Sequence, residues 1–91
     1  MDEKVIAPFD QQIVLKWFER YPKFETFIGA GTISLKMARE ILDIDRYFMY
    51  DIYKELLAGG VVTASGTNAW RATAELKEYL KERKENANAE N

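Results

Sequence analysis

The first third of the chain carries apolar residues at helical spacing between clear start and stop signals. Asp10 can cap a helix over residues 11–21, and Pro22 ends it. One face of that helix is apolar: Ile13, Val14, Trp17, Phe18 and Tyr21. Phe9, which precedes the cap, is placed to pack on Val14 as a hydrophobic staple. The following stretch, "KFETFIGAGTI", reads as a loop with a short β-prone piece at one or both ends.

The middle of the chain predicts two helices joined by a tight turn. Ser34 can cap a short helix over residues 35–42, with Leu35, Ala38, Ile41 and Leu42 on one face. Asp45 can cap a third helix over residues 46–58, whose buried face holds Met49, Ile52, Tyr53 and Leu56. Ile44 and Met49 match a second hydrophobic staple.

The last third predicts a β-hairpin followed by a helix. "VVT" and "AWRAT" read as strands, and "ASGTN" between them is polar and turn-prone. Trp70 alternates with Ala72 on one strand face, which favours a core position over a base-stacking platform. Thr73 can cap a helix running to about Lys84. We expect one domain over residues 1–85 and a disordered tail over residues 86–91.

The glycines at 59, 60 and 66 raise the question of a phosphate-binding loop. Such a loop stands between a strand and the start of a helix, so that backbone amides converge on the anion. Here Gly59 and Gly60 follow a helix and precede a strand, and no lysine adjoins Gly66. The glycines are therefore interpreted as a helix stop and a hairpin turn.

This order of elements resembles the winged helix-turn-helix fold, mainly α with a small β-hairpin (α+β). The resemblance is carried by "ISLKMAREILDIDRYFMYDIYKELLAGGVV" and "TASGTNAWRAT". It implies that Ala38 lets the third helix pack across the second, and that Ile44 anchors the third helix. Asp43 stands where the family's turn commonly has glycine, and aspartate tolerates the left-handed conformation.

Among winged helices, the chain looks similar to the gamma domain of FtsK-type DNA translocases. "LLAGGVV" and the short glycine-containing wing carry this likeness. That domain reads DNA with an asparagine and arginines on its third helix. Tyr47, Phe48 and Asp51 stand at those positions, so the resemblance implies the shape without that mode of reading DNA.

Composition narrows the chemistry. The 91 residues include no cysteine and no histidine, which excludes disulfides, thiolate or histidine metal sites and histidine-based catalytic triads. Asp43 and Asp45 lie close together but fit helix caps better than an acid/base pair. We expect no enzyme, metal or cofactor. Residues 1–8 carry charges where a secretion signal would be apolar, and no apolar run could span a membrane, so a cytoplasmic protein is expected.

Charge leaves two functions open. The net charge is −2, and residues 34–57 are net negative. The scaffold favours double-stranded DNA as partner, bound with modest affinity by a transcription regulator or an accessory factor of a plasmid, phage or chromosome system. The candidate DNA-binding residues are Lys36, Arg46, Tyr47, Tyr50, Lys54, Thr67, Asn68 and Arg71. The alternative is a protein–protein interaction module that binds a partner through the tyrosine-rich face of helix three.

Two further surfaces have open interpretations. Residues 59–74 contain no acid and several hydroxyl side chains, which suits either a wing that enters a minor groove or an uncharged hairpin. The last helix mixes charges at helical spacing, which is typical of a solvated face. A homodimer through Leu76, Tyr79 and Leu80 is the other reading of that helix.

Overall fold

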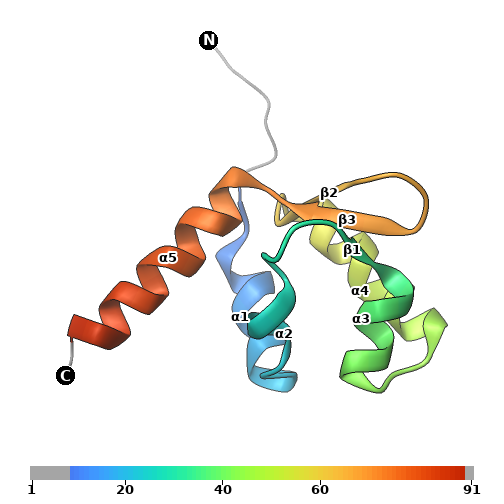
Figure 1. Ribbon diagram of the computed structural model, residues 1–91, viewed down its shortest axis with the longest axis horizontal. Coiled ribbons are helices and arrows are strands. Elements are labelled where there is room, and N and C mark those ends of the chain that lie inside the picture. Colours follow the sequence, from blue (N-terminus) through green and yellow to red (C-terminus); the bar gives the residue numbers. More distant parts are fainter. Residues whose placement is uncertain (1–8, 90–91) are drawn as a thin grey trace, which may run out of the picture.

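The computed structural model describes residues 9–89, and residues 1–8 and 90–91 lie outside that part. The fold is mainly helical with a small antiparallel sheet, as expected for an α+β class (Figure 1). Its elements, in order, are α1 (Gln11–Arg20), α2 (Phe24–Phe27), β1 (Ile33–Ser34), α3 (Leu35–Leu42), α4 (Arg46–Ala58), β2 (Val62–Ala64), β3 (Ala69–Ala72) and α5 (Ala74–Ala89).

The predicted side-chain caps are confirmed at four helices. At each helix start, a side-chain oxygen accepts a hydrogen bond from a backbone N–H two or three residues later. The pairs are Asp10 with Gln12, Ser34 with Met37, Asp45 with Phe48, and Thr73 with Leu76. Each cap satisfies an amide that the first turn of a helix leaves without an intrahelical partner. Short polar residues therefore set where these helices begin.

The segment after Pro22 differs from expectation at its first end. We expected a loop with a β-prone piece at one or both ends, but residues 24–27 form α2 and only the far end forms a strand. Phe24, Phe27 and Ile28 are all buried, and their spacing of three and four residues places them on one side of a helical turn. Burial of these three side chains explains why the helical turn forms.

The α3–α4 connection is tight. Asp43 adopts the left-handed conformation (φ 59°, ψ 52°), and its N–H donates to the Arg39 carbonyl. Ala38 is fully buried, and α3 and α4 are in extensive contact. A small side chain at position 38 is consistent with the close approach of the two helices. Gly60, after α4, also has positive φ (68°), which glycine adopts without strain.

The sheet has three antiparallel strands in the order β1-β3-β2. Ile33 pairs with Trp70, and Thr63 pairs with Arg71. Trp70 is fully buried and stacks on Tyr53 at 6.0 Å between ring centroids, which confirms its core position. The sheet therefore closes one side of a core to which all five helices contribute.

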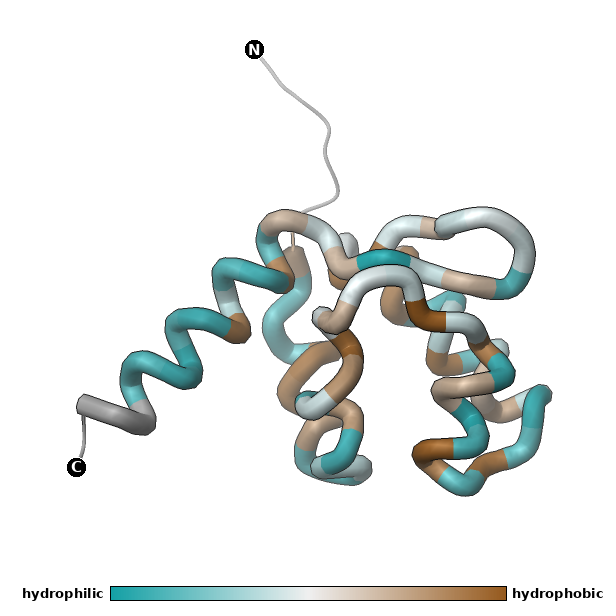
Figure 2. The backbone as a smooth tube through the Cα atoms, in the orientation of Figure 1, coloured by the Kyte–Doolittle hydropathy of each residue, from teal (hydrophilic) through white to brown (hydrophobic). Residues whose placement is uncertain are grey.

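Helix α5 runs further than predicted. It continues to Ala89, so residues 86–89, expected in a disordered tail, are helical, and residues 90 and 91 lie outside the described part. No glycine or proline interrupts the sequence after Lys84, which explains the continuation. Figure 1 shows the C-terminal end of α5 extending beyond the other helices, and most of the helix is hydrophilic in Figure 2.

Two features that the described residues lack concern membranes and metals. Within residues 9–89, no helix has the length and apolarity needed to cross a bilayer. The same part of the chain contains no group of three or more acidic side chains placed to share a metal ion.

Candidate nucleic-acid interface

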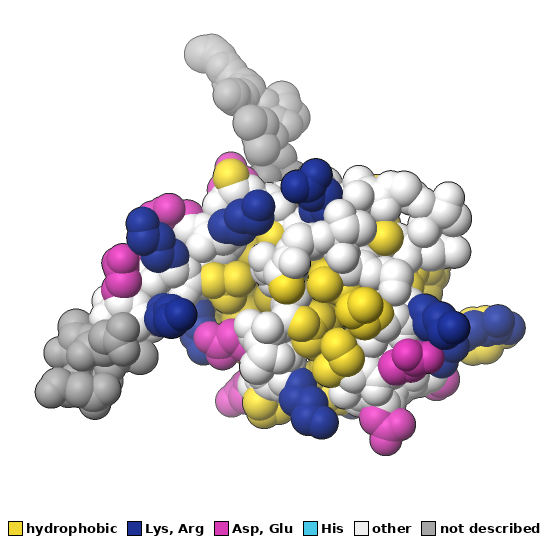
Figure 3. Space-filling model, in the orientation of Figure 1, with side chains coloured by type: hydrophobic (Ala, Val, Ile, Leu, Met, Phe, Trp, Pro, Cys, Tyr) yellow, Lys and Arg dark blue, Asp and Glu magenta, His cyan; other side chains and the backbone are white. Residues whose placement is uncertain are grey.

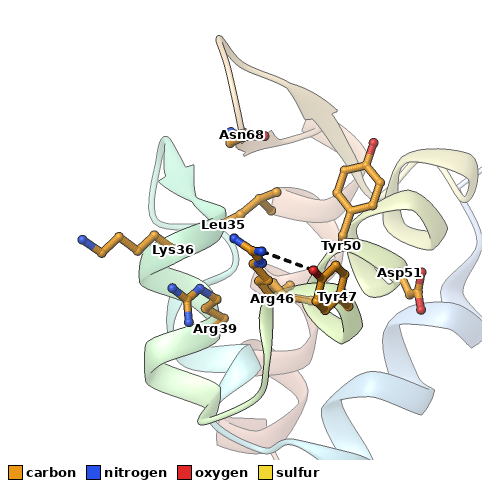
Figure 4. Close-up of a pocket in the computed structure, with 9 residues that line it drawn as sticks. Leu35, Lys36, Arg39, Arg46, Tyr47, Tyr50, Asp51 and Asn68 are labelled. Atoms are coloured by element: carbon orange, nitrogen blue, oxygen red, sulfur yellow. Dashed lines mark hydrogen bonds between the residues drawn. The ribbon is translucent and has the colours of Figure 1, made fainter.

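An open groove of about 450 Å³ lies between α3, α4 and the turn that joins β2 to β3 (Figure 4). The residues that line it are Leu35, Lys36, Arg39, Arg46, Tyr47, Met49, Tyr50, Asp51 and Asn68. They come from three separate segments of the chain. The packing of α3 against α4 and of the hairpin against α3 therefore creates the groove.

The groove is cationic although the chain is net negative. Three basic side chains and one carboxylate line it, a net charge of +2. Lys36 and Arg39 are three residues apart on α3, and Arg46 is the first residue of α4. The salt bridges between described residues are Lys16–Glu55 and Arg83–Glu25, so none neutralises a cation of this groove.

Most of the acidic residues among residues 34–57 do not line the groove, and three of them have a structural role outside it. Asp45 caps α4 and accepts from the Phe48 N–H at 2.8 Å, and Asp43 forms the left-handed turn. Glu55 accepts from Trp17 Nε1 and Lys16 Nζ, both on α1. The net negative charge of that segment is therefore not the charge of the groove.

Two tyrosines project from α4 into this surface. Tyr47 is 70% exposed and Tyr50 is 49% exposed. The Arg46 guanidinium donates to the Tyr47 hydroxyl at 3.2 Å and lies 5.1 Å from the ring centroid. The Lys54 ammonium lies 5.4 Å from the Tyr50 ring centroid. A cation therefore lies over the ring of each tyrosine.

The hairpin turn contributes one residue to the groove. Asn68 has positive φ (57°), and its carbonyl accepts from the Leu35 N–H at 2.8 Å. This bond fixes the end of the turn to the start of α3. Thr67 and Arg71 are exposed but do not line the groove. Arg71 pairs with Thr63 across the strands, and the pleat puts it on the opposite side from buried Trp70.

Five of the eight candidate DNA-binding residues therefore meet in one groove, namely Lys36, Arg46, Tyr47, Tyr50 and Asn68. Lys54 adjoins it through Tyr50. Sequence reasoning left Arg39 out of the candidate site. The signal was available, because Arg39 follows Lys36 by three residues and so shares its helix face.

The proposed dimer residues need one correction. Leu76 is fully buried in the core of its own chain, so it is not part of an exposed dimer face. Tyr79 and Leu80 are half-buried and also pack against that core, and Tyr79 lies 5.5 Å from the Phe9 ring centroid. The apolar stripe of α5 thus holds the helix to the domain.

Comparison of the chain with known protein families, with curated proteins and with solved structures gives no match.

Proposed function

We propose that the chain is a winged helix-turn-helix protein that binds double-stranded DNA, with α4 in the major groove and the β2–β3 hairpin as the wing. The order α1, β1, α3, α4, β2, β3 and the strand order β1-β3-β2 support the winged-helix assignment. Buried Ala38 and the left-handed Asp43 at the α3–α4 turn support it further.

One observation carries the DNA-binding proposal. Lys36, Arg39 and Arg46 gather in a single groove, while Asp45 and Glu55 are engaged in bonds elsewhere. Phosphate neutralisation supplies most of the non-specific affinity of proteins for DNA, so such clustering offsets the net charge of −2. Tyr47, Tyr50 and Asn68 add hydroxyl and amide groups that bond phosphates or base edges.

An electrophoretic shift series on a random-sequence duplex tests this proposal. With three to five phosphate contacts per protomer, raising the salt from 50 to 200 mM should weaken binding by roughly 40- to 500-fold. Absence of any shift at 50 mM salt would contradict DNA binding.

The second candidate is a module that binds a protein through the same face. The exposed rings of Tyr47 and Tyr50 favour it, because tyrosine is enriched at protein interface hot spots. It predicts that Tyr47→Ala and Tyr50→Ala lose a co-purifying partner while the parent shifts no DNA at low salt. Retention of every partner by both variants would exclude this candidate.

A further inference from the structure

Asp51 is the acid of the groove, and it has no structural task among the described residues. Its carboxylate forms neither a side-chain hydrogen bond nor a salt bridge with another described residue. Asp45 and Glu55, on either side of it in sequence, each accept a hydrogen bond that stabilises the fold. Asp51 is exposed, in a groove whose other charges are positive.

The position of Asp51 separates it from two of the three cations. Figure 4 shows Lys36 and Arg39 on α3 at one edge of the site and Asp51 on α4 at the other edge. Residues 47, 50, 51 and 54 follow helical spacing, so Asp51 shares the outer face of α4 with both tyrosines. A recognition helix turns this face to the base edges, while the helix before it crosses the phosphate backbone. On that docking, α3 meets phosphates and Asp51 meets bases.

An ionised carboxylate can only accept hydrogen bonds. In the major groove, the donors are the N4 amine of cytosine and the N6 amine of adenine. Adenine carries its N7 acceptor beside that amine, and this lone pair repels a carboxylate. Thymine and guanine present acceptors only, apart from the thymine methyl. Cytosine is thus the base that best matches Asp51.

We infer that Asp51 is a specificity-determining residue that selects a cytosine in the bound DNA by accepting from its N4 amine. This inference rests on the proposed DNA binding. The same carboxylate repels phosphate, so it weakens binding to sequences that do not offer the amine. Asp51 accordingly lowers the affinity for non-specific DNA and raises the discrimination between sequences.

The experiment compares the parent, Asp51→Asn and Glu78→Gln on duplex pools with a randomised central segment. Glu78 is an exposed acid on α5, outside the groove, so Glu78→Gln is matched to Asp51→Asn in charge change. The parent and Glu78→Gln should enrich sites with one invariant C·G pair. Asp51→Asn should lose that pair or exchange it for A·T, because asparagine pairs with adenine N6 and N7. Other enriched positions should persist.

Direct titration then quantifies the contact. Replacing the selected C·G pair by T·A puts an acceptor opposite Asp51 and should weaken parent binding by about 5- to 150-fold. Asp51→Asn should bind the two duplexes within about threefold of each other and bind random duplex more tightly than the parent does. Identical enriched sites for parent and Asp51→Asn would overturn this inference and leave DNA binding intact. Failure of the parent to retain any pool DNA would overturn both proposals.

Discussion

Helix α4 has two flanks built from similar residues, and their contacts differ. The flank toward α1 contacts Lys16, Trp17 and Arg20, and the groove flank carries Arg46 and Tyr47. On the α1 flank, the Glu55 carboxylate accepts hydrogen bonds from the Lys16 ammonium and the Trp17 indole N–H. On the groove flank, the lining cations have no salt-bridge partner in the described chain.

The aromatic side chains repeat the contrast. Arg20 lies within 6.0 Å of the ring centroids of Trp17, Tyr21 and Phe48, and Trp17 is only 7% exposed. Arg46 lies over Tyr47, which is 70% exposed. Cation–aromatic pairs therefore occur on both flanks, and burial distinguishes them. Residue type alone therefore does not distinguish the two flanks; the groove flank differs in its exposed rings and in cations without a salt-bridge partner among the described residues.

The largest expected effect is a difference in the free energy of unfolding between an aromatic substitution on the α1 flank and one on the groove flank. Trp17→Ala should lower the free energy of unfolding by about 3–5 kcal/mol, because it empties a buried site between α1 and α4. Tyr47→Ala should change it by no more than about 0.5 kcal/mol. Urea denaturation of both variants measures this difference. Similar losses in the two variants would show that the groove flank is part of the core.

Removal of the groove cations should abolish most of the DNA affinity. The triple variant Lys36→Ala, Arg39→Ala, Arg46→Ala should bind random duplex about 100- to 500-fold more weakly at 0.1 M salt, since each lost phosphate contact costs nearly tenfold there. Fluorescence anisotropy measures the affinity.

The matched control removes an equal charge from α5. Lys77, Lys81 and Lys84 share one face of that helix, away from the acidic positions, and Figure 3 shows basic side chains along α5. Alanine at all three positions should weaken binding far less than the groove triple variant does. Equal losses would mean that net charge, rather than the groove, governs binding.

Two acids four residues apart on α4 should differ in stability. Glu55→Ala should destabilise the fold by about 1–3 kcal/mol, because the Trp17 indole N–H loses its acceptor. Asp51→Ala should stay within about 0.5 kcal/mol of the parent. Thermal and urea unfolding test this pair. A costly Asp51→Ala would show that Asp51 supports the fold and would remove the reason for assigning it to recognition.

The smallest expected effects come from two tyrosine hydroxyls on α4. The Tyr53 hydroxyl donates to the buried Ala69 carbonyl at 3.3 Å, so Tyr53→Phe should cost about 0.5–1.5 kcal/mol of stability. Tyr50→Phe should leave stability unchanged and weaken DNA binding by about 2- to 10-fold. Loss of DNA affinity in Tyr53→Phe alone would reverse the assignment of the two faces.

Much of the fold could be predicted from sequence because its signals are local. Asp10, Ser34, Asp45 and Thr73 act within three residues of their own positions, and caps of this kind are readable from the sequence. The turn at Asp43 is equally local. The helical turn at Phe24 was missed although its apolar spacing was visible, because the segment is short and glycines follow it.

The groove depends on contacts that are distant in sequence. From the sequence, Glu55 contributes to the negative charge of the α4 segment. In the structure its carboxylate accepts from Trp17, 38 residues away, so its charge lies on the α1 side of α4. Leu76 belongs to an apolar stripe that the sequence alone allows to be exposed, and only the packing of α5 shows that it is buried in the domain. Charge summed over residues 34–57 therefore gave the wrong sign for the groove, because helix packing assigns each charge to a flank.

The salt dependence of DNA binding tests the central claim most directly. The logarithm of the binding constant should fall against the logarithm of salt concentration with a slope of about −3 to −5 per protomer. In the groove triple variant, the slope should be shallower by about two to three. A parent slope near zero, or an unchanged slope in the triple variant, would contradict the assignment of Lys36, Arg39 and Arg46 as the phosphate-binding residues.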